Sequence, residues 1–310
     1  MKTSNSYYCN VAVIMAAYND ETYINSQINS IESQINVTPT IFISLDKSPD
    51  SIQSHIKKLA LLKDSIKLLP YGDIFGGAAP NFFRLISDVD FSEFNYIAFA
   101  DQDDIWYPDK LSRAIQMLTK YNCDGYSSNF TAFWPDGRKK LINKAQPQVE
   151  WDYLFQSPGP GCTFVLTKKL AIELQAFVRD NKEPMSSVWL HDWFIYAFAR
   201  SHNYKWYIDK YSSMLYRQHE NNQVGVNTGY KAFLYRMRFV LSGKALEQSV
   251  LLARLCGLAS HPFVNRWCDL SRSDFLYLAF NAYNCRRKPS EKILFLLSCL
   301  LLSVIGHKKP

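Results

Sequence analysis

The chain has 310 residues, of which 47% are hydrophobic, so it can bury a sizeable core and is not a disordered protein. The formal net charge is +7, but residues 226–310 alone carry 13 Lys or Arg against 4 Asp or Glu, which points to an anionic partner such as a membrane or a nucleic acid. The seven cysteines form no Cys-x-x-Cys pair, which argues against a zinc site or a disulfide framework.

Strands and helices alternate through the first 120 residues. Continuous apolar runs predict strands buried on both faces at 11–16, 40–45, 66–69 and 96–100. Apolar residues at helical spacing predict helices at 24–31, 51–62, 81–86 and 111–118. This alternation predicts an α/β fold with a mostly parallel central sheet flanked by helices.

The pattern loosens after residue 120. Strands are expected at 125–133 and 162–167, helices at 168–178 and from His191, and two short strands at 206–208 and 214–216 around a turn. Residues 134–160 are rich in loop-forming residues, and helices are expected at 233–241, 249–258 and 275–283. We therefore predict a catalytic domain over residues 1–225 and a basic, apolar helical region over residues 226–310.

Two apolar runs bear on the membrane. The run at 11–17 is short and leads directly into polar residues, so we interpret it as a strand rather than a signal peptide. The run at 293–305 is shorter than the ~17–25 residues that span a bilayer. Because Arg286, Arg287 and Lys288 precede it, a helix lying in a membrane interface is slightly favoured over a core or partner helix.

Polar side chains follow three of the four early strands. Tyr18, Asp46 and Asp101 each come directly after an apolar run, and parallel strands would gather them at one edge of the sheet. Asp101 and Asp103 are separated by one residue, and such carboxylates repel one another unless a cation offsets their charge. Oxygen ligands of this kind suit Mg²⁺ or Mn²⁺. An acidic turn that caps the next helix is the alternative, but it would not require three strand ends to converge.

These motifs together resemble glycosyltransferase family 2, and within it the rhamnosyltransferase-like bacterial enzymes of surface-polysaccharide synthesis. The resemblance covers roughly residues 9–225 and implies the GT-A nucleotide-sugar-binding fold. The motifs that carry it are Ala16-Ala17-Tyr18-Asn19, Asp46, the run from Phe99 to Trp106 with its Asp-x-Asp motif, Pro108, Lys110-Leu111, Pro160-Gly161-Cys162-Thr163, His191-Asp192-Trp193 and Tyr216-Arg217-Gln218-His219.

The resemblance implies a role for each matching residue. Asp192 is the expected catalytic base, Asp103 the direct metal ligand, and His219 a further group at the metal or diphosphate site. The residues expected to bind the nucleotide-sugar are Ala17, Tyr18, Asp46 at the nucleobase, Asn81, Asp101 at the ribose, and Gln102. The residues expected at the acceptor side or in the pocket wall are Trp106, Gly161 and Trp193.

Structural alternatives stand beside these roles. Asp192 could be only a helix-start residue, Asp46 a turn former, Asn81 a helix cap, and His219 a structural histidine. Many family members have two acidic residues after the second strand, whereas Leu45 precedes Asp46 here, so the nucleobase preference stays open.

The expected reaction is an inverting, metal-dependent transfer of a sugar, with dTDP-rhamnose favoured as donor and UDP-hexoses next. A divalent cation stabilises the departing diphosphate, and a carboxylate base takes the proton of the acceptor hydroxyl. The expected acceptor is a growing, lipid-linked cell-surface glycan, which places the enzyme in the cytoplasm at the inner face of the plasma membrane. No nucleic-acid partner is expected.

A nucleotidyltransferase and a non-catalytic carbohydrate-binding protein are alternative functions. A nucleotidyltransferase also uses carboxylates and a metal at strand ends, but residues 16–23 contain no Lys or Arg to cradle a triphosphate. A non-catalytic carbohydrate-binding protein would not need a metal ligand and a base together.

Overall fold

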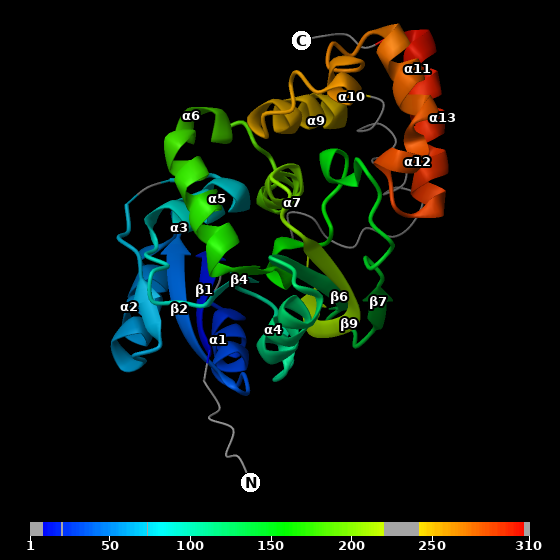
Figure 1. The fold of residues 1–310 in the computed structure, drawn as a ribbon. Coiled ribbons are helices and arrows are strands. Elements are labelled where there is room, and N and C mark those ends of the chain that lie inside the picture. Colours follow the sequence, from blue (N-terminus) through cyan, green and yellow to red (C-terminus); the bar gives the residue numbers. More distant parts are fainter. Residues whose placement is uncertain (1–8, 20, 73, 220–241, 307–310) are drawn as a thin grey trace. The chain divides into compact units, whose positions relative to one another are not determined.

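A computed structural model describes residues 9–19, 21–72, 74–219 and 242–306 (Figure 1). These residues divide into two compact units. The first contains described residues up to 145, then 159–192 and 204–219, and the second contains 146–158, 193–203 and the described residues from 242 onward. The predicted boundary near residue 225 and the predicted helix at 233–241 lie outside the described residues.

The first unit is built on a mixed sheet of nine described strands in the order β3-β2-β1-β4-β8-β6-β9-β5, with β7 paired to β6. The neighbours β3, β2, β1 and β4 run parallel, whereas β8, β7 and β5 are antiparallel to the strands beside them. The bounds are β1 (Cys9–Ala17), β2 (Val37–Leu45), β3 (Ile66–Leu68), β4 (Tyr96–Asp101), β5 (Ile105–Trp106), β6 (Gly125–Phe133), β7 (Lys139–Ile142), β8 (Val165–Thr167) and β9 (Trp206–Arg217).

The four strands predicted before residue 101 are confirmed, and their register aligns their carboxyl ends. Ala17 of β1 pairs with Leu45 of β2, and Ala16 pairs with Asp101 of β4. The residues of β1 from 11 to 15 are fully buried, as expected for a strand with both faces covered. The residues that follow β1, β2 and β4 therefore lie at one edge of the sheet.

The helices of the first unit follow the predicted pattern. Pro108, predicted in the first helical turn, instead lies just before α4, whose N-cap is Asp109. The helices are α1 (Ile24–Glu32), α2 (Asp50–Leu62), α3 (Ala78–Asp88), α4 (Lys110–Tyr121), α5 (Lys168–Asp180) and α6 (Lys182–Met185), and α7 (His191–Ser201) begins in this unit.

Two parts of the sheet differ from the prediction. β9 is one strand from 206 to 217, where we predicted two strands around a turn. Its polar centre remains extended because Asp209 is buried against the guanidinium of Arg113 (2.8 Å), while irregular pairing with β6 absorbs the extra residues. β7 was not predicted because three of its four residues are exposed and it lacks an apolar face.

The second unit consists of helices and of two stretches inserted from earlier in the chain. Its described helices are α9 (Lys244–Leu255), α10 (Pro262–Asn265), α11 (Arg272–Phe280), α12 (Ala282–Cys285) and α13 (Pro289–Ile305), together with the 3₁₀ turn η1 (Asp152–Leu154). The predicted helix over 249–258 is found as α9, and the one over 275–283 is split into α11 and α12. None of the described helices combines the length and the apolar character needed to cross a membrane.

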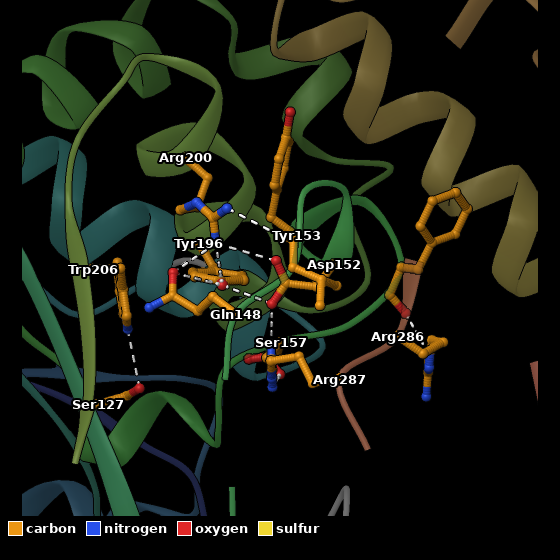
Figure 2. Close-up of polar contacts among 12 residues, drawn as sticks. Ser127, Gln148, Asp152, Tyr153, Ser157, Tyr196, Arg200, Trp206, Arg286 and Arg287 are labelled. Carbon is orange, nitrogen blue, oxygen red and sulfur yellow. Dashed lines mark hydrogen bonds and ion pairs between the residues drawn. The ribbon is translucent and has the colours of Figure 1, made fainter. Parts of the chain in front are cut away.

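A buried ionic network organises the second unit (Figure 2). Asp152 has no exposed surface, and its carboxylate accepts hydrogen bonds from Arg200 (3.1 Å), Arg287 (2.7 Å) and the Tyr196 hydroxyl (2.9 Å). Arg286 donates to the carbonyl of Phe155 (2.6 Å) and is partly exposed. Of the basic residues predicted beside a membrane interface, Arg287 is buried, because the buried carboxylate of Asp152 requires a cationic partner.

Candidate active site

The end of β4 is tied to the end of β1 by a reciprocal pair of hydrogen bonds. The backbone N–H of Tyr18 donates to the Gln102 side chain (2.8 Å), whose amide nitrogen donates back to the Tyr18 carbonyl (2.8 Å). The backbone N–H of Asp46 likewise donates to the carbonyl of Ala17 (2.9 Å). These residues, all predicted to bind the nucleotide-sugar, therefore converge at one edge of the sheet. The side chain of Tyr18 remains mostly exposed.

The Asp46 carboxylate holds the loop that contains Phe75, Gly76 and Gly77, called the glycine loop below. It is 3% exposed and accepts backbone hydrogen bonds from Phe75 and Gly76 (2.9 Å each) and from Lys47 (2.7 Å). Gly76 has φ +73°, a conformation that favours glycine. Asp46 thus organises a turn, as its structural alternative proposed, and its contact with a nucleobase stays a prediction.

Asn81 lies inside α3 and is not a helix cap, because that helix begins at Ala78 with Gly77 as its N-cap. The side chain is 2% exposed, and its amide nitrogen donates to the Ser44 carbonyl (3.1 Å). Its Oδ1 has no hydrogen-bond partner among the described residues. Burying an amide oxygen without a hydrogen bond lowers the stability of the fold, unless a bound group or water donates to it.

Asp103 and His219 are brought together from positions 116 residues apart. Their side chains approach to 2.6 Å, and the His219 ring stacks on Tyr23 with ring centroids 5.9 Å apart. Arg217 donates from Nε to the backbone carbonyl of Asp103 (2.8 Å). The segment at the end of β9 therefore lies against Asp103, so the two predicted metal-site residues are neighbours.

Negative charge is concentrated around Asp101. Burial, followed by the neighbouring charges of Asp103 and Asp192, raises the pKa of Asp101 to about 7. Asp192, in the first turn of α7, is thus close enough for its charge to act on the cluster. A cation bound here would offset this charge, which is the behaviour expected of a divalent-metal site.

The buried side of the cluster contains Asp104, Lys110 and Cys162, which were not predicted as site residues. Asp104 and Lys110 have no exposed surface, and Lys110 donates from Nζ to the Cys162 carbonyl (3.0 Å). Burial lowers the pKa of Lys110 to about 8, and the charge of Asp104 partly opposes this. The missed signal is that Lys110 shares a helix face with the apolar residues Ala114 and Leu118.

One group of side chains in the described part of the chain lies close enough together to hold a cation. One ligand atom from each of Asp101, Asp104 and Cys162 lies within 4.8 Å of the other two. Burial raises the pKa of the Cys162 thiol well above its usual range, so it stays protonated and is a poor ligand for a hard cation. Asp103 and His219, whose side chains meet beside this group, stay the predicted metal-site residues.

The absence of a side chain at Gly161 leaves room for the ring of His191, the residue before Asp192. A Cβ atom at Gly161 would lie 2.2 Å from Nε2 of His191, whose ring stacks on Phe82 with centroids 4.0 Å apart. Burial lowers the pKa of His191 to about 3, so the ring is neutral. Of the two predicted pocket-wall tryptophans, Trp106 is 2% exposed and Trp193 is 9% exposed, so both are mostly covered.

Comparison with known proteins identifies the family. The Glycosyl transferase family 2 profile matches residues 12–172, just over half of the chain. A dTDP-rhamnosyl transferase RfbG of Shigella flexneri is 45% identical over 288 residues, which cover 93% of this chain and 99% of that protein. A UDP-Glc:alpha-D-GlcNAc-diphosphoundecaprenol beta-1,3-glucosyltransferase WfgD of Escherichia coli is 27% identical over 56% of this chain and 66% of its own length.

Solved structures share the fold at low sequence identity. The mannosyltransferase PcManGT from Pyrobaculum calidifontis, in complex with GDP-Man and Mn²⁺, aligns with a TM-score of 0.55 at 13% identity over 97% of this chain and 89% of its own. S. aureus TarS in complex with UDP-GlcNAc aligns with a TM-score of 0.52 at 14% identity over 97% and 93% of the two chains. The fold is therefore GT-A, and the chain belongs to glycosyltransferase family 2 and is a glycosyltransferase.

Proposed function

We propose that the chain transfers rhamnose from dTDP-rhamnose to a hydroxyl of a growing, lipid-linked cell-surface glycan, with inversion at the anomeric carbon. The single observation that carries this proposal is the convergence of Asp192 with Asp101 and Asp103 at the carboxyl edge of the sheet. The name of the RfbG relative supports the donor, because the similarity extends over nearly the whole of both chains.

Asp192 is the proposed catalytic base. A carboxylate that faces the anomeric carbon from the side opposite the diphosphate can take the proton of the attacking hydroxyl, which typically contributes about 10²–10⁴-fold. Asp192 lies in the first turn of α7, where its charge acts on Asp101. One base and no covalent sugar–enzyme step give inversion.

The metal site is assigned to Asp103 and His219, with Asp101 beside them. These side chains would hold Mg²⁺ or Mn²⁺, which supplies charge stabilisation to the departing diphosphate. Burial, followed by the charges of Asp103 and Asp192, raises the pKa of Asp101, and a divalent cation bound beside these carboxylates would offset their charge. Asp103 and His219 are partly exposed, at 14% and 20% of their side chains, so a ligand can reach them.

The nucleoside end of the donor is assigned to the glycine loop and to α3. The Asp46 carboxylate fixes the loop through Phe75 and Gly76, and Oδ1 of Asn81, which has no partner among the described residues, is buried at the same strand edge. Tyr18 offers an exposed ring at this edge, and the Gln102 pair holds its backbone in place.

Membrane contact is assigned to an apolar face on α11 and α13, which lie side by side (Figure 1). We propose that this face lies against the inner surface of the plasma membrane, where a lipid-linked acceptor would be found. The exposed lysine Lys288, rather than the buried Arg287, supplies adjacent positive charge. The exposed apolar residues of the face are Leu276, Phe280, Ile293, Leu297, Leu300, Leu301, Val304 and Ile305.

The test combines a donor panel with a base variant. Purified chain is incubated with dTDP-rhamnose, UDP-glucose or UDP-GlcNAc, and release of nucleoside diphosphate is followed with and without a membrane extract that contains lipid-linked acceptors. We expect turnover with dTDP-rhamnose, and an Asp192→Asn variant that binds dTDP-rhamnose normally but turns over at least about 10²-fold more slowly.

The exposed Asp180→Asn change on α5 is the matched control and should leave turnover unchanged. Preference for a UDP-sugar would contradict the assignment of dTDP-rhamnose as donor. Near-normal turnover of Asp192→Asn would contradict the assignment of Asp192 as catalytic base. Release of pyrophosphate from a nucleoside triphosphate would favour a nucleotidyltransferase, and sugar binding without turnover would favour a non-catalytic protein.

A further inference from the structure

We infer that the second unit contains a saccharide-binding site formed entirely by its own residues, which holds a segment of the acceptor glycan away from the transferred sugar. The identification of the ligand as acceptor glycan rests on the proposed function. The site is an open hollow of about 670 Å³ between the segment around Trp151 and helices α10 and α11. No role in the catalytic chemistry has been assigned to any of its residues.

Aromatic rings form the floor of this hollow. Trp151 and Phe263 stack with centroids 4.3 Å apart and an interplanar angle of 9°, and Tyr277 tilts against Phe263 at 5.8 Å. Trp151 and Phe263 are largely covered, whereas Tyr277 is half-buried and presents part of its ring. A partly exposed aromatic ring offers an apolar surface to the C–H face of a sugar while its hydroxyl stays in water.

Polar side chains surround the floor. Asn265, Asn284 and Glu150 line the hollow, and within the described part of the chain their side chains have no hydrogen-bond partner. An amide presents both donors and acceptors, which matches the mixed hydrogen bonding of sugar hydroxyls. These groups are therefore available to a ligand without breaking contacts within the protein.

The charges around the hollow exclude other partners. Arg266 lies over the Tyr277 ring (5.4 Å), and Glu150 lines the same hollow, so both signs of charge are present. A nucleic acid or anionic lipid would require an excess of positive charge, and a partner helix would require a mainly apolar groove. An aromatic floor with an amide rim instead favours a polar, uncharged chain such as a glycan.

The floor is held in place by the network behind it. The Trp151 backbone N–H donates to the carbonyl of Asn284 (2.9 Å), and the next residue is Asp152, which is locked by Arg200 and Arg287. Trp151 therefore cannot shift without disturbing a buried ionic cluster. A pre-organised floor reduces the ordering cost of binding a flexible glycan.

The test is saturation-transfer NMR on the full-length chain, with methyl α-L-rhamnopyranoside, methyl β-D-glucopyranoside and methyl N-acetyl-β-D-glucosaminide as probes. We expect weak binding of at least one probe, in the millimolar range. Tyr277→Ala and Asn265→Ala should each weaken it about tenfold or more, with melting temperatures close to that of the parent. Tyr283→Ala, which changes an exposed aromatic residue on α12 outside the hollow, should bind as the parent does.

Failure of all three probes to bind would overturn the inference, as would binding that neither Tyr277→Ala nor Asn265→Ala weakens. The measurement requires neither donor nor turnover, so it is separate from the test of the proposed function. Probe binding in a chain that fails the donor panel would keep the saccharide site and discard only its assignment to the acceptor.

Discussion

Lys110 offers a sharp test of the electrostatics of the active site. It is an ammonium group with no exposed surface, and burial lowers its pKa from the ordinary 10.5 to about 8. That fall corresponds to a net penalty of about 3 kcal/mol for the charged form. The ammonium donates to the Cys162 carbonyl, and the charge of Asp104 partly opposes the fall in pKa, whereas burial and then the charges of Asp103 and Asp101 raise the pKa of Asp104 well above its usual range.

The perturbation is Lys110→Met, which keeps most of the side-chain volume and removes the charge. Because the buried Asp104 then loses its neighbouring cation, we expect the free energy of unfolding to fall by about 3–5 kcal/mol. For a unit of this size, that is a drop of about 10 °C in melting temperature. Removing both charges in Lys110→Met/Asp104→Asn should recover much of the loss, since replacing a buried pair together is often neutral.

The assay is equilibrium urea unfolding of the two single variants and the double variant, with Mn²⁺ binding measured on those that fold. Lys120→Met, on an exposed position of the same helix, is the control and should change stability by less than about 0.5 kcal/mol. If the double variant loses as much stability as the two single variants combined, Lys110 does not compensate the charge of Asp104 and the reasoning is refuted.

Three further predictions concern the metal, the buried histidine and the apolar face. Activity should require Mg²⁺ or Mn²⁺ and be nearly abolished in Asp103→Ala; full turnover in excess chelator would remove the metal role. The pKa of His191 is 6.5 in the unfolded chain and about 3 in the folded protein, so only the unfolded state takes up a proton between these values. The free energy of unfolding should therefore fall as the pH drops below 6.5, by about 2 kcal/mol at pH 5. Urea unfolding at pH 7 and pH 5 should show a smaller loss for His191→Asn than for the parent, and equal losses would contradict the assignment. Replacing Leu297 and Val304 with Ser should reduce flotation of the protein with anionic vesicles. The control Leu61→Ser, on a similarly exposed site of α2, should float as the parent does. Unchanged flotation of the double variant would contradict the proposal that this face binds the membrane.

The parallel half of the sheet could be predicted because its signals are local. The runs that became β1, β2 and β4 are continuous and apolar, since both faces of these strands are covered. The positions of Tyr18, Asp46 and Asp101 then followed from strand direction alone. The pairing of Asp103 with His219 was expected only from the family resemblance, because 116 residues separate them.

The remaining features depend on contacts that no local pattern encodes. A polar residue such as Asp209 appeared to interrupt β9, although Arg113 compensates its charge within the sheet. The burial of Arg287 depends on Asp152, to which it donates across the second unit. Lys110 is fully buried, although lysines are rarely without exposed surface. In each case the partner lies at least 50 residues away in sequence or belongs to another element.

The network around Asp152 also constrains the order in which the protein can fold during synthesis. The carboxylate is made 135 residues before Arg287, and at about 5–20 residues per second the ribosome needs on the order of 10 s to supply that partner. Until then the segment around Asp152 lacks a cation that it needs for burial, and closing so long a loop carries an entropic cost. The second unit should therefore complete its core only after nearly the whole chain has been translated, whereas β1, β2 and β4 can pair as soon as residue 101 has emerged.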